Sequence, residues 1–178
     1  MKTINTKRAG QRPAKPKPRA RRALSHGFEL PRDVEEFVLK AGADGIRLTN
    51  LQKVFWPAEG YTKRDLLQYY LDVSRWLLPH VQDRAMVMKR YPNGITGEFF
   101  FMKRYNQNAW NRTLASVYSV RPKPRAPVST PVTWREVERG VRIEDFTMQN
   151  APRRLSKIGD LWRPLLAKNN RMNLKKIL

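Results

Sequence analysis

The chain has 178 residues and no Cys, which suits one compact domain with a modest core and excludes disulfides, thiolate metal sites and cysteine nucleophiles. No stretch approaches about 18 uninterrupted apolar residues and no secretory leader is visible, so neither a transmembrane helix nor export is predicted. The 36 Lys and Arg outnumber the 15 Asp and Glu and give a net charge of +21, which favours a polyanionic partner: nucleic acid, with ribosomal RNA or an anionic membrane surface as alternatives.

Residues 1 to about 25 are rich in Lys, Arg and Pro and contain no acid. Like-charge repulsion and Pro residues without an amide donor oppose a packed helix or strand there. A disordered basic arm is predicted, which either tethers the chain to DNA or serves as a solubilising linker. Because the arm is Pro-rich and is not a basic amphipathic helix, membrane binding is not expected.

A short helix is predicted over residues 31–40, because the acids at its start suit the positive end of a helix dipole. Strands are predicted over 46–50 and 53–57, with a turn at 58–61. The clearest element is a helix over 62–78. Thr62 is a good N-cap with Asp65 three residues on, apolar side chains repeat at helical spacing, and Pro79 is expected to end the helix.

The second half of the chain contains shorter elements. Strands are predicted over 85–90 and 97–103, separated by a turn at 91–94, and a β-like stretch over 113–120. A Pro-rich connector is expected over 122–131. One or two helical turns at 134–140 and an amphipathic helix over 153–166, interrupted by Gly159, complete the chain.

Several strings of the sequence resemble one known family. They are LTNLQKVFWP at 48–57, GYTKRD at 60–65, KRYPNG at 89–94 and FFFMK at 99–103. These are similar to the opening of the polymerase domain of bacterial ATP-dependent DNA ligase D, of the archaeo-eukaryotic primase superfamily. The strings YNQNAW at 105–110, YSVRP at 118–122, VSTP at 128–131 and DFT at 145–147, with Arg112, Thr113 and Trp134, are similar to its distal block.

The resemblance covers about residues 46–168 and implies an α+β fold, with a reduced primase-polymerase-like mixed sheet and flanking helices. The expected organisation is a basic arm and short helix at 1–45, an N-terminal part of the domain at 46–104, a C-terminal part at 105–168 and a basic tail at 169–178. The resemblance also implies a cytoplasmic, nucleoid-associated bacterial protein that acts in non-homologous end joining.

The two parts abut at about Arg104, whereas the family separates them by a central segment. That segment normally carries an Asp-x-Asp pair and a histidine, and a third Asp normally stands where this chain has Arg104. No Asp-x-Asp occurs anywhere in the sequence. Nucleotidyl transfer uses two divalent cations held by carboxylates. We therefore expect no catalytic residue, no metal site and no cofactor, although the family uses Mn or Mg.

The other acids and the two His residues are given structural interpretations. The acidic pairs are read as solvated charges or helix-start acids; they are Glu35 with Glu36, Glu136 with Glu138, and Glu144 with Asp145. His26 lies in the arm and His80 follows Pro79, and no ligand or partner is expected for either.

The resemblance assigns Asn50, Lys53 and Lys63 to the 5′-phosphate at a DNA gap or break. One amide and two ammonium groups would give charge-assisted hydrogen bonds to a terminal phosphate, and the first turn of the helix favours an anion at Lys63. The alternative is that Lys53 and Lys63 are ordinary surface lysines.

Template contacts are implied for Arg90, Phe100 and Phe101, since bases stack on aromatic side chains, while Phe99 is expected to be structural. The resemblance also implies that three cations hold an incoming triphosphate, although part of that site belongs to the missing segment. They are Lys89, Arg112 and Arg121.

Three functions are compatible with these features. The first is a truncated DNA-end-binding protein without polymerase activity, with Ku or a full-length ligase D as expected partners. The second is an active nucleotidyltransferase that uses substitute acids or a partner chain. The third is a basic protein that coats nucleic acid through its arm. Self-association is also expected, because loss of central strands would expose apolar edges and faces.

Overall fold

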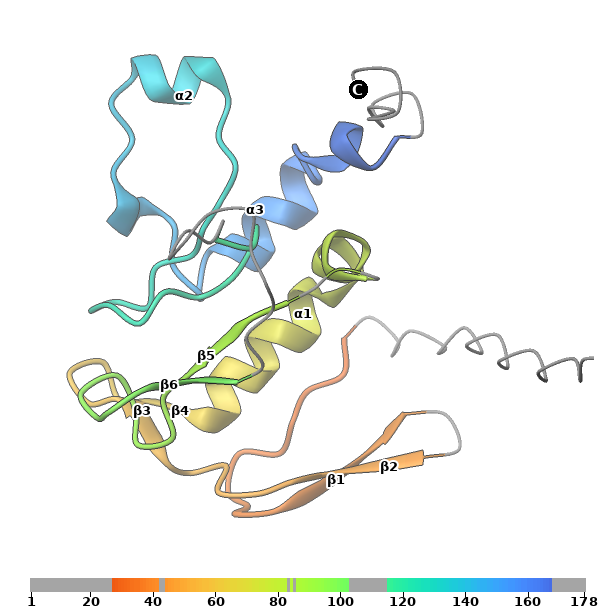
Figure 1. The fold of residues 1–178 in the computed structure, drawn as a ribbon, viewed down its shortest axis with the longest axis vertical. Helices are drawn as coiled ribbons and strands as arrows, with labels where there is room; N and C mark the ends of the chain where they lie inside the picture. The colour runs from red at the N-terminus through yellow and green to blue at the C-terminus, as the bar shows by residue number, and fades with distance from the viewer. Residues whose placement is uncertain (1–26, 42–43, 83, 85, 103–114, 168–178) are drawn as a thin grey trace, which may run out of the picture.

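The computed structural model describes residues 27–167, apart from 42–43, 83, 85 and 103–114 (Figure 1). The fold is α+β, as expected: the strands lie in the first part of the described chain and most of the helices follow them. In chain order the elements are β1 Phe37–Ala41, β2 Asp44–Leu48, β3 Val54–Trp56, β4 Tyr61–Thr62, α1 Lys63–Val81, β5 Met88–Arg90, β6 Phe100–Met102, α2 Trp134–Glu138, the 3₁₀ helix η1 Ile143–Asp145, α3 Ala151–Ile158 and the 3₁₀ helix η2 Arg163–Leu166. The predicted basic arm and C-terminal tail lie outside the described residues.

The described strands form three separate two-stranded antiparallel sheets, β1–β2, β3–β4 and β5–β6. The first of them corrects the helix predicted over 31–40. Phe37 pairs with Leu48 and Leu39 pairs with Ile46, so Phe37–Ala41 is one strand of a β-hairpin, and residues 31–36 are neither helix nor strand. The strand's apolar and aromatic residues pack well across a strand pair, and that pairing outweighs the helix-start signal of the preceding acids.

Helix α1 is the central element of the fold (Figure 1). Thr62 is its N-cap as predicted: its hydroxyl accepts from the amide of Asp65 while the Asp65 carboxylate accepts from the amide of Thr62, which is a complete capping box. The helix continues past Pro79 to Val81. Tyr69 and Val73 are buried on its inner face, and Leu66, Tyr70 and Leu77 pack beside them as the spacing predicted.

One hydrophobic core joins the two parts of the chain. From the first part it takes Trp56, Tyr69 and Val73, and from the second Val117, Tyr118, Ala126, Val128, Met148, Ala151 and Leu155. The Pro-rich stretch 122–131 is therefore more than a connector. The Trp56 indole donates to the Lys123 carbonyl at 2.9 Å, and the Tyr69 hydroxyl donates to the Tyr118 carbonyl at 2.8 Å.

The turn between β5 and β6 rests directly on β3. Gly94 has φ +81°, and a Cβ added there would lie 2.9 Å from the Phe55 carbonyl oxygen. The Ile95 amide donates to the same oxygen at 2.9 Å. Only glycine fits both the left-handed backbone and the close approach.

We expect Gly94→Ala to lower the free energy of unfolding by at least about 2 kcal/mol, because it combines backbone strain with a clash against backbone. The matched control is Gly60→Ala, which has φ +71° but open space around the new Cβ and should cost only about 1 kcal/mol. Urea denaturation of both variants measures the difference. Equal losses would show that the contact with Phe55 is not tight.

Among the described residues, no helix is both long and apolar enough to cross a membrane.

Helix α3 packs beside α1 and ends at Gly159, where φ is +75°. Helix α2 begins at the N-cap Thr133, in agreement with the short helix predicted there.

Candidate nucleic-acid interface

The three residues assigned to a 5′-phosphate meet at the tight turn that follows β2. Asn50 adopts φ 55°, a left-handed conformation that Asn tolerates better than most residues. The turn lets the Lys53 amide donate to the Asn50 carbonyl at 3.2 Å, and the Lys63 amide donate to the Lys53 carbonyl at 2.8 Å. The fold thus brings Asn50, Lys53 and Lys63 together from both sides of the β3–β4 hairpin.

Each ammonium group in this cluster makes one described hydrogen bond to the protein. Lys63 Nζ donates to the Thr49 carbonyl at 2.6 Å, and Lys53 Nζ donates to Asn93 Oδ1 at 2.7 Å. An ammonium has three N–H donors, so both lysines keep donors for an anion while their positions are fixed. The sequence analysis did not assign Asn93 to the phosphate site, although Asn93 lies in the turn predicted at residues 91–94.

The start of α1 contributes no free amide to this cluster. The amide of Lys63 bonds to the Lys53 carbonyl, that of Arg64 to the Leu51 carbonyl at 2.9 Å, and that of Asp65 to the Thr62 hydroxyl. The Asp65 carboxylate also occupies the N-cap. The expected helix-dipole contribution is therefore small, and an anion here would be held by side chains.

Strands β5 and β6 present cations and aromatic rings together on an exposed ribbon. Lys89 pairs with Phe101 and Arg90 pairs with Phe100. The side chains of Phe99, Phe100 and Phe101 are 49%, 47% and 41% exposed. The assignment of Phe99 to the core is therefore wrong, because no second layer covers either face of this two-stranded sheet within the described residues.

The cations of the ribbon stack on its rings. Lys89 Nζ lies 3.5 Å from the Phe99 ring centroid, and the Arg90 guanidinium lies 5.9 Å from that of Phe100. The rings of Phe99 and Phe101 meet edge to face at 5.8 Å. Alternation along the strand places Phe100 and Phe101 on opposite faces, so the ribbon offers a ring and a cation on each face.

The lysine cluster and the aromatic ribbon are structurally linked. The turn between β5 and β6 supplies Asn93 to Lys53, and it is fixed to β3 at Gly94 and Ile95. Lys53 therefore lies next to the end of the ribbon. The residues implied for a triphosphate are not brought together in this way: no described contact joins Lys89 to Arg121, and Arg112 lies outside the described residues.

His80 has a partner, contrary to the expectation that it had none. Its Nε2 lies 2.7 Å from Asp160 Oδ2, and the Tyr118 hydroxyl donates to Asp160 Oδ1 at 2.6 Å. The amide of Trp162 also donates to this carboxylate at 2.9 Å. Burial acts to raise the pKa of Asp160, but these hydrogen bonds outweigh it and hold the pKa below its ordinary value.

The carboxylates in the described part of the chain are not grouped in one place. Of the 15 acids, only Asp44 and Asp83 have side chains outside the described part, and no three His, Asp or Glu residues there are placed to share an ion. Several are committed elsewhere: Asp65 caps α1, Glu136 pairs with Arg154 and Asp160 bonds to Tyr118. Hard cations need several carboxylate oxygens in one place, and the described acids provide no such group.

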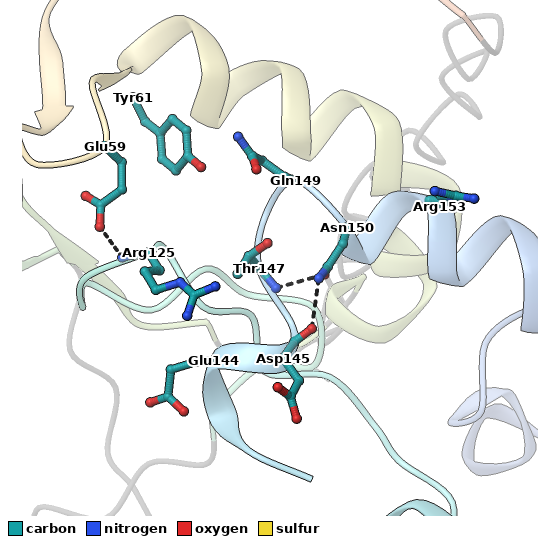
Figure 2. A pocket seen from close by; sticks show the side chains of 9 residues that line it. All are labelled: Glu59, Tyr61, Arg125, Glu144, Asp145, Thr147, Gln149, Asn150 and Arg153. Atoms are coloured by element: carbon teal, nitrogen blue, oxygen red, sulfur yellow. Dashed lines mark hydrogen bonds between the residues drawn. The ribbon is translucent and has the colours of Figure 1, made fainter.

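A polar hollow between the two parts of the chain shows the same lack of a carboxylate cage (Figure 2). Glu59 from the β3–β4 turn accepts from the amide of Arg125 on the opposite wall. The Asn150 side chain donates to the Asp145 carbonyl and accepts from the Thr147 amide, at 2.8 and 2.9 Å. Glu59, Glu144 and Asp145 line the hollow together with Arg125 and Arg153, so its walls have charges of both signs.

Comparison with known proteins gives consistent matches. The family model described as LigD, primase-polymerase domain, matches residues 62–106 and 104–162. The multifunctional non-homologous end joining protein LigD of Mycolicibacterium smegmatis is 42% identical over 64 residues, 36% of this chain and 8% of that protein. The bifunctional LigD of Bacillus subtilis is 40% identical over 58 residues, 33% of this chain and 10% of that protein. The LigD of Pseudomonas aeruginosa is 30% identical over 95 residues, 53% of this chain and 10% of that protein.

Proposed function

Because the chain belongs to the LigD primase-polymerase domain family, we propose that it binds DNA ends through their 5′-phosphate during non-homologous end joining. The matches cover only 8% to 10% of the length of these relatives, so the proposal concerns this domain and none of their other activities. Ku or a full-length ligase D would be its partner at the break.

The lysine cluster is the observation that carries the proposal. Backbone hydrogen bonds join Asn50, Lys53 and Lys63. The Lys53 ammonium is bonded to Asn93 and the Lys63 ammonium to the Thr49 carbonyl, which supports two oriented cations beside this turn. A terminal phosphate dianion would accept charge-assisted hydrogen bonds from the remaining donors. A 5′-hydroxyl has no such charge, and the cluster should therefore discriminate between the two kinds of end.

The exposed ribbon supplies the second half of the proposed interface. Phe100 and Phe101 would stack on unpaired template bases, and Arg90 would contact the template backbone. Their exposure supports base stacking, and the bond from Lys53 to Asn93 supports a ribbon that lies beside the lysine cluster. Because Phe100 and Phe101 lie on opposite faces, each ring would take a different base. Nucleotide binding by Lys89, Arg112 and Arg121 receives no comparable support from the described contacts.

We further propose that the chain holds an end without extending it. The family model matches in two pieces that meet at residues 104–106, which supports the absence of a central segment between them. The described carboxylates are dispersed or committed to structural hydrogen bonds. Bond formation by two metal ions requires a carboxylate cage, and the arrangement of these acids favours end binding alone.

Competition binding with the full chain tests this function. At about 0.15 M salt, a blunt duplex with a 5′-phosphate should compete about 10- to 100-fold better than the same duplex with a 5′-hydroxyl, which corresponds to one or two charge-assisted hydrogen bonds. Salt must be held constant because non-specific DNA binding depends on it steeply. Equal competition by both ends would reject a 5′-phosphate site.

A further inference from the structure

Residues 133–145, here called the α2 lobe, form an excursion with α2 at its tip and both connecting segments running back to the body of the fold (Figure 1). Large apolar side chains are exposed on it. Trp134 is 82% exposed, Ile143 59%, Val137 47% and Val141 36%. A tryptophan exposed to this extent, on a segment with further exposed aliphatic side chains, is typical of an interaction surface.

The charge of the α2 lobe differs from that of the rest of the chain. The whole chain has 36 basic and 15 acidic residues. The lobe has three basic residues, Arg135, Arg139 and Arg142, and four acidic residues, Glu136, Glu138, Glu144 and Asp145. A nearly neutral lobe with exposed apolar side chains is poorly suited to bind DNA. It can, however, approach a strongly basic protein, such as a second copy of this chain, without charge repulsion.

Glu136 ties the lobe to the body of the fold. Glu136 closes a capping box with Thr133 and forms an ion pair with Arg154 of α3. Hydrogen bonds from Arg154, and from the Thr133 amide and hydroxyl, lower the pKa of Glu136 to about 2 against the opposing effect of burial. A preorganised surface loses less conformational freedom on association.

We propose that the α2 lobe is a contact between two copies of this chain. A twofold contact requires a patch that is complementary to itself. Arg135, Glu138 and Arg139 form no ion pair among the described residues, so charges of both signs are available beside Trp134. In a twofold pairing the arginines of one copy would face the glutamate of the other, with the tryptophans buried between them.

The other exposed apolar surface, the β5–β6 ribbon, fits a second copy less well. Its cations Lys89 and Arg90 are accompanied by a single acid, Glu98. Two such ribbons would repel each other at close range, whereas two α2 lobes would not. The contact area of the lobe is small, and the dimer is therefore expected to be weak and concentration-dependent.

Analytical ultracentrifugation of the nuclease-treated full chain, at several protein concentrations, tests the proposal. The wild type should show a reversible monomer–dimer equilibrium. Trp134→Ala should raise the dimer dissociation constant about 30-fold, as for an interface residue at a contact centre. Leu165→Ala removes an apolar side chain that is 56% exposed outside the lobe, and this control should leave the constant unchanged.

Charge reversal gives a second readout that misfolding would not reproduce. Glu138→Arg makes the lobe basic and Arg135→Glu makes it acidic, so each variant alone should dimerise less than the wild type, while an equimolar mixture should recover association. A wild-type chain that stays monomeric would overturn the proposal, as would a dimer insensitive to Trp134→Ala. Association that requires DNA, and is lost after nuclease treatment, would overturn it in favour of bridging by nucleic acid.

Discussion

Replacing Lys53 and Lys63 together with Ala is expected to remove the preference for a 5′-phosphorylated over a 5′-hydroxyl DNA end. The preference is attributed to charge-assisted hydrogen bonds from these two ammonium groups, so affinity for the phosphorylated end should fall about 10- to 100-fold, while affinity for the hydroxyl end changes much less. The dependence of the binding constant on salt should also become shallower by about two phosphate contacts. Fluorescence anisotropy with both ends measures these effects.

The matched control removes the same charge from elsewhere on the surface. Lys40 on β1 and Lys157 on α3 are exposed and lie outside the lysine cluster. Lys40→Ala with Lys157→Ala should weaken binding to both ends equally and keep the preference. If the control abolishes the preference as well, the lysines act only through net charge, and a localised site is contradicted.

Asp160→Ala is expected to lower the free energy of unfolding by about 3 kcal/mol. The change leaves the buried His80 imidazole and the Tyr118 hydroxyl without their acceptor, and unpaired buried polar groups are costly. Tyr118→Phe removes a single hydrogen bond and should cost only about 1 kcal/mol. Denaturant titration of both variants tests the network, and a loss of less than about 1 kcal/mol for Asp160→Ala would show that the carboxylate has no structural role.

The same carboxylate predicts how stability depends on pH. Because the folded pKa of Asp160 lies below its ordinary value of 3.8, the unfolded chain binds this proton more readily than the folded chain. The stabilisation is therefore fully present above the ordinary pKa and is lost as pH falls through the folded pKa. Below about pH 5 the wild type should lose stability more steeply than Asp160→Ala. Parallel curves would contradict the contribution of this group.

Local signals explain which elements could be predicted from the sequence. Helix α1 has its cap, its acid at N3 and its apolar repeat within one stretch, and all three indicate the same structure. The segment 31–40 gave a helix-start signal, but its conformation depends on pairing with β2, which a local pattern does not reveal. His80 and Asp160 are separated by 80 residues, so their contact depends on how α1 packs against the segment that follows α3.

The candidate site depends on tertiary contacts to a similar extent. The resemblance assigned Asn50, Lys53 and Lys63, and the fold places them at one turn. It did not reveal Asn93, because the approach of the β5–β6 turn to β3 is a tertiary contact. The expectation for Phe99 came from the strand pattern and was wrong: three consecutive Phe residues normally suggest that at least one is buried, but all three are exposed. Here the sheet has no covering layer among the described residues.

The central claim is that this chain holds a DNA end by its 5′-phosphate and does not extend the primer. One gapped duplex, with a fluorescent 5′-phosphorylated downstream strand and a 3′-hydroxyl primer, tests both halves of it when incubated with the full chain, manganese and all four deoxynucleotides. We predict saturable binding that weakens when the 5′-phosphate is removed, together with an unchanged primer length at saturating protein. Nucleotide addition to the primer, or binding that ignores the 5′-phosphate, would contradict the account.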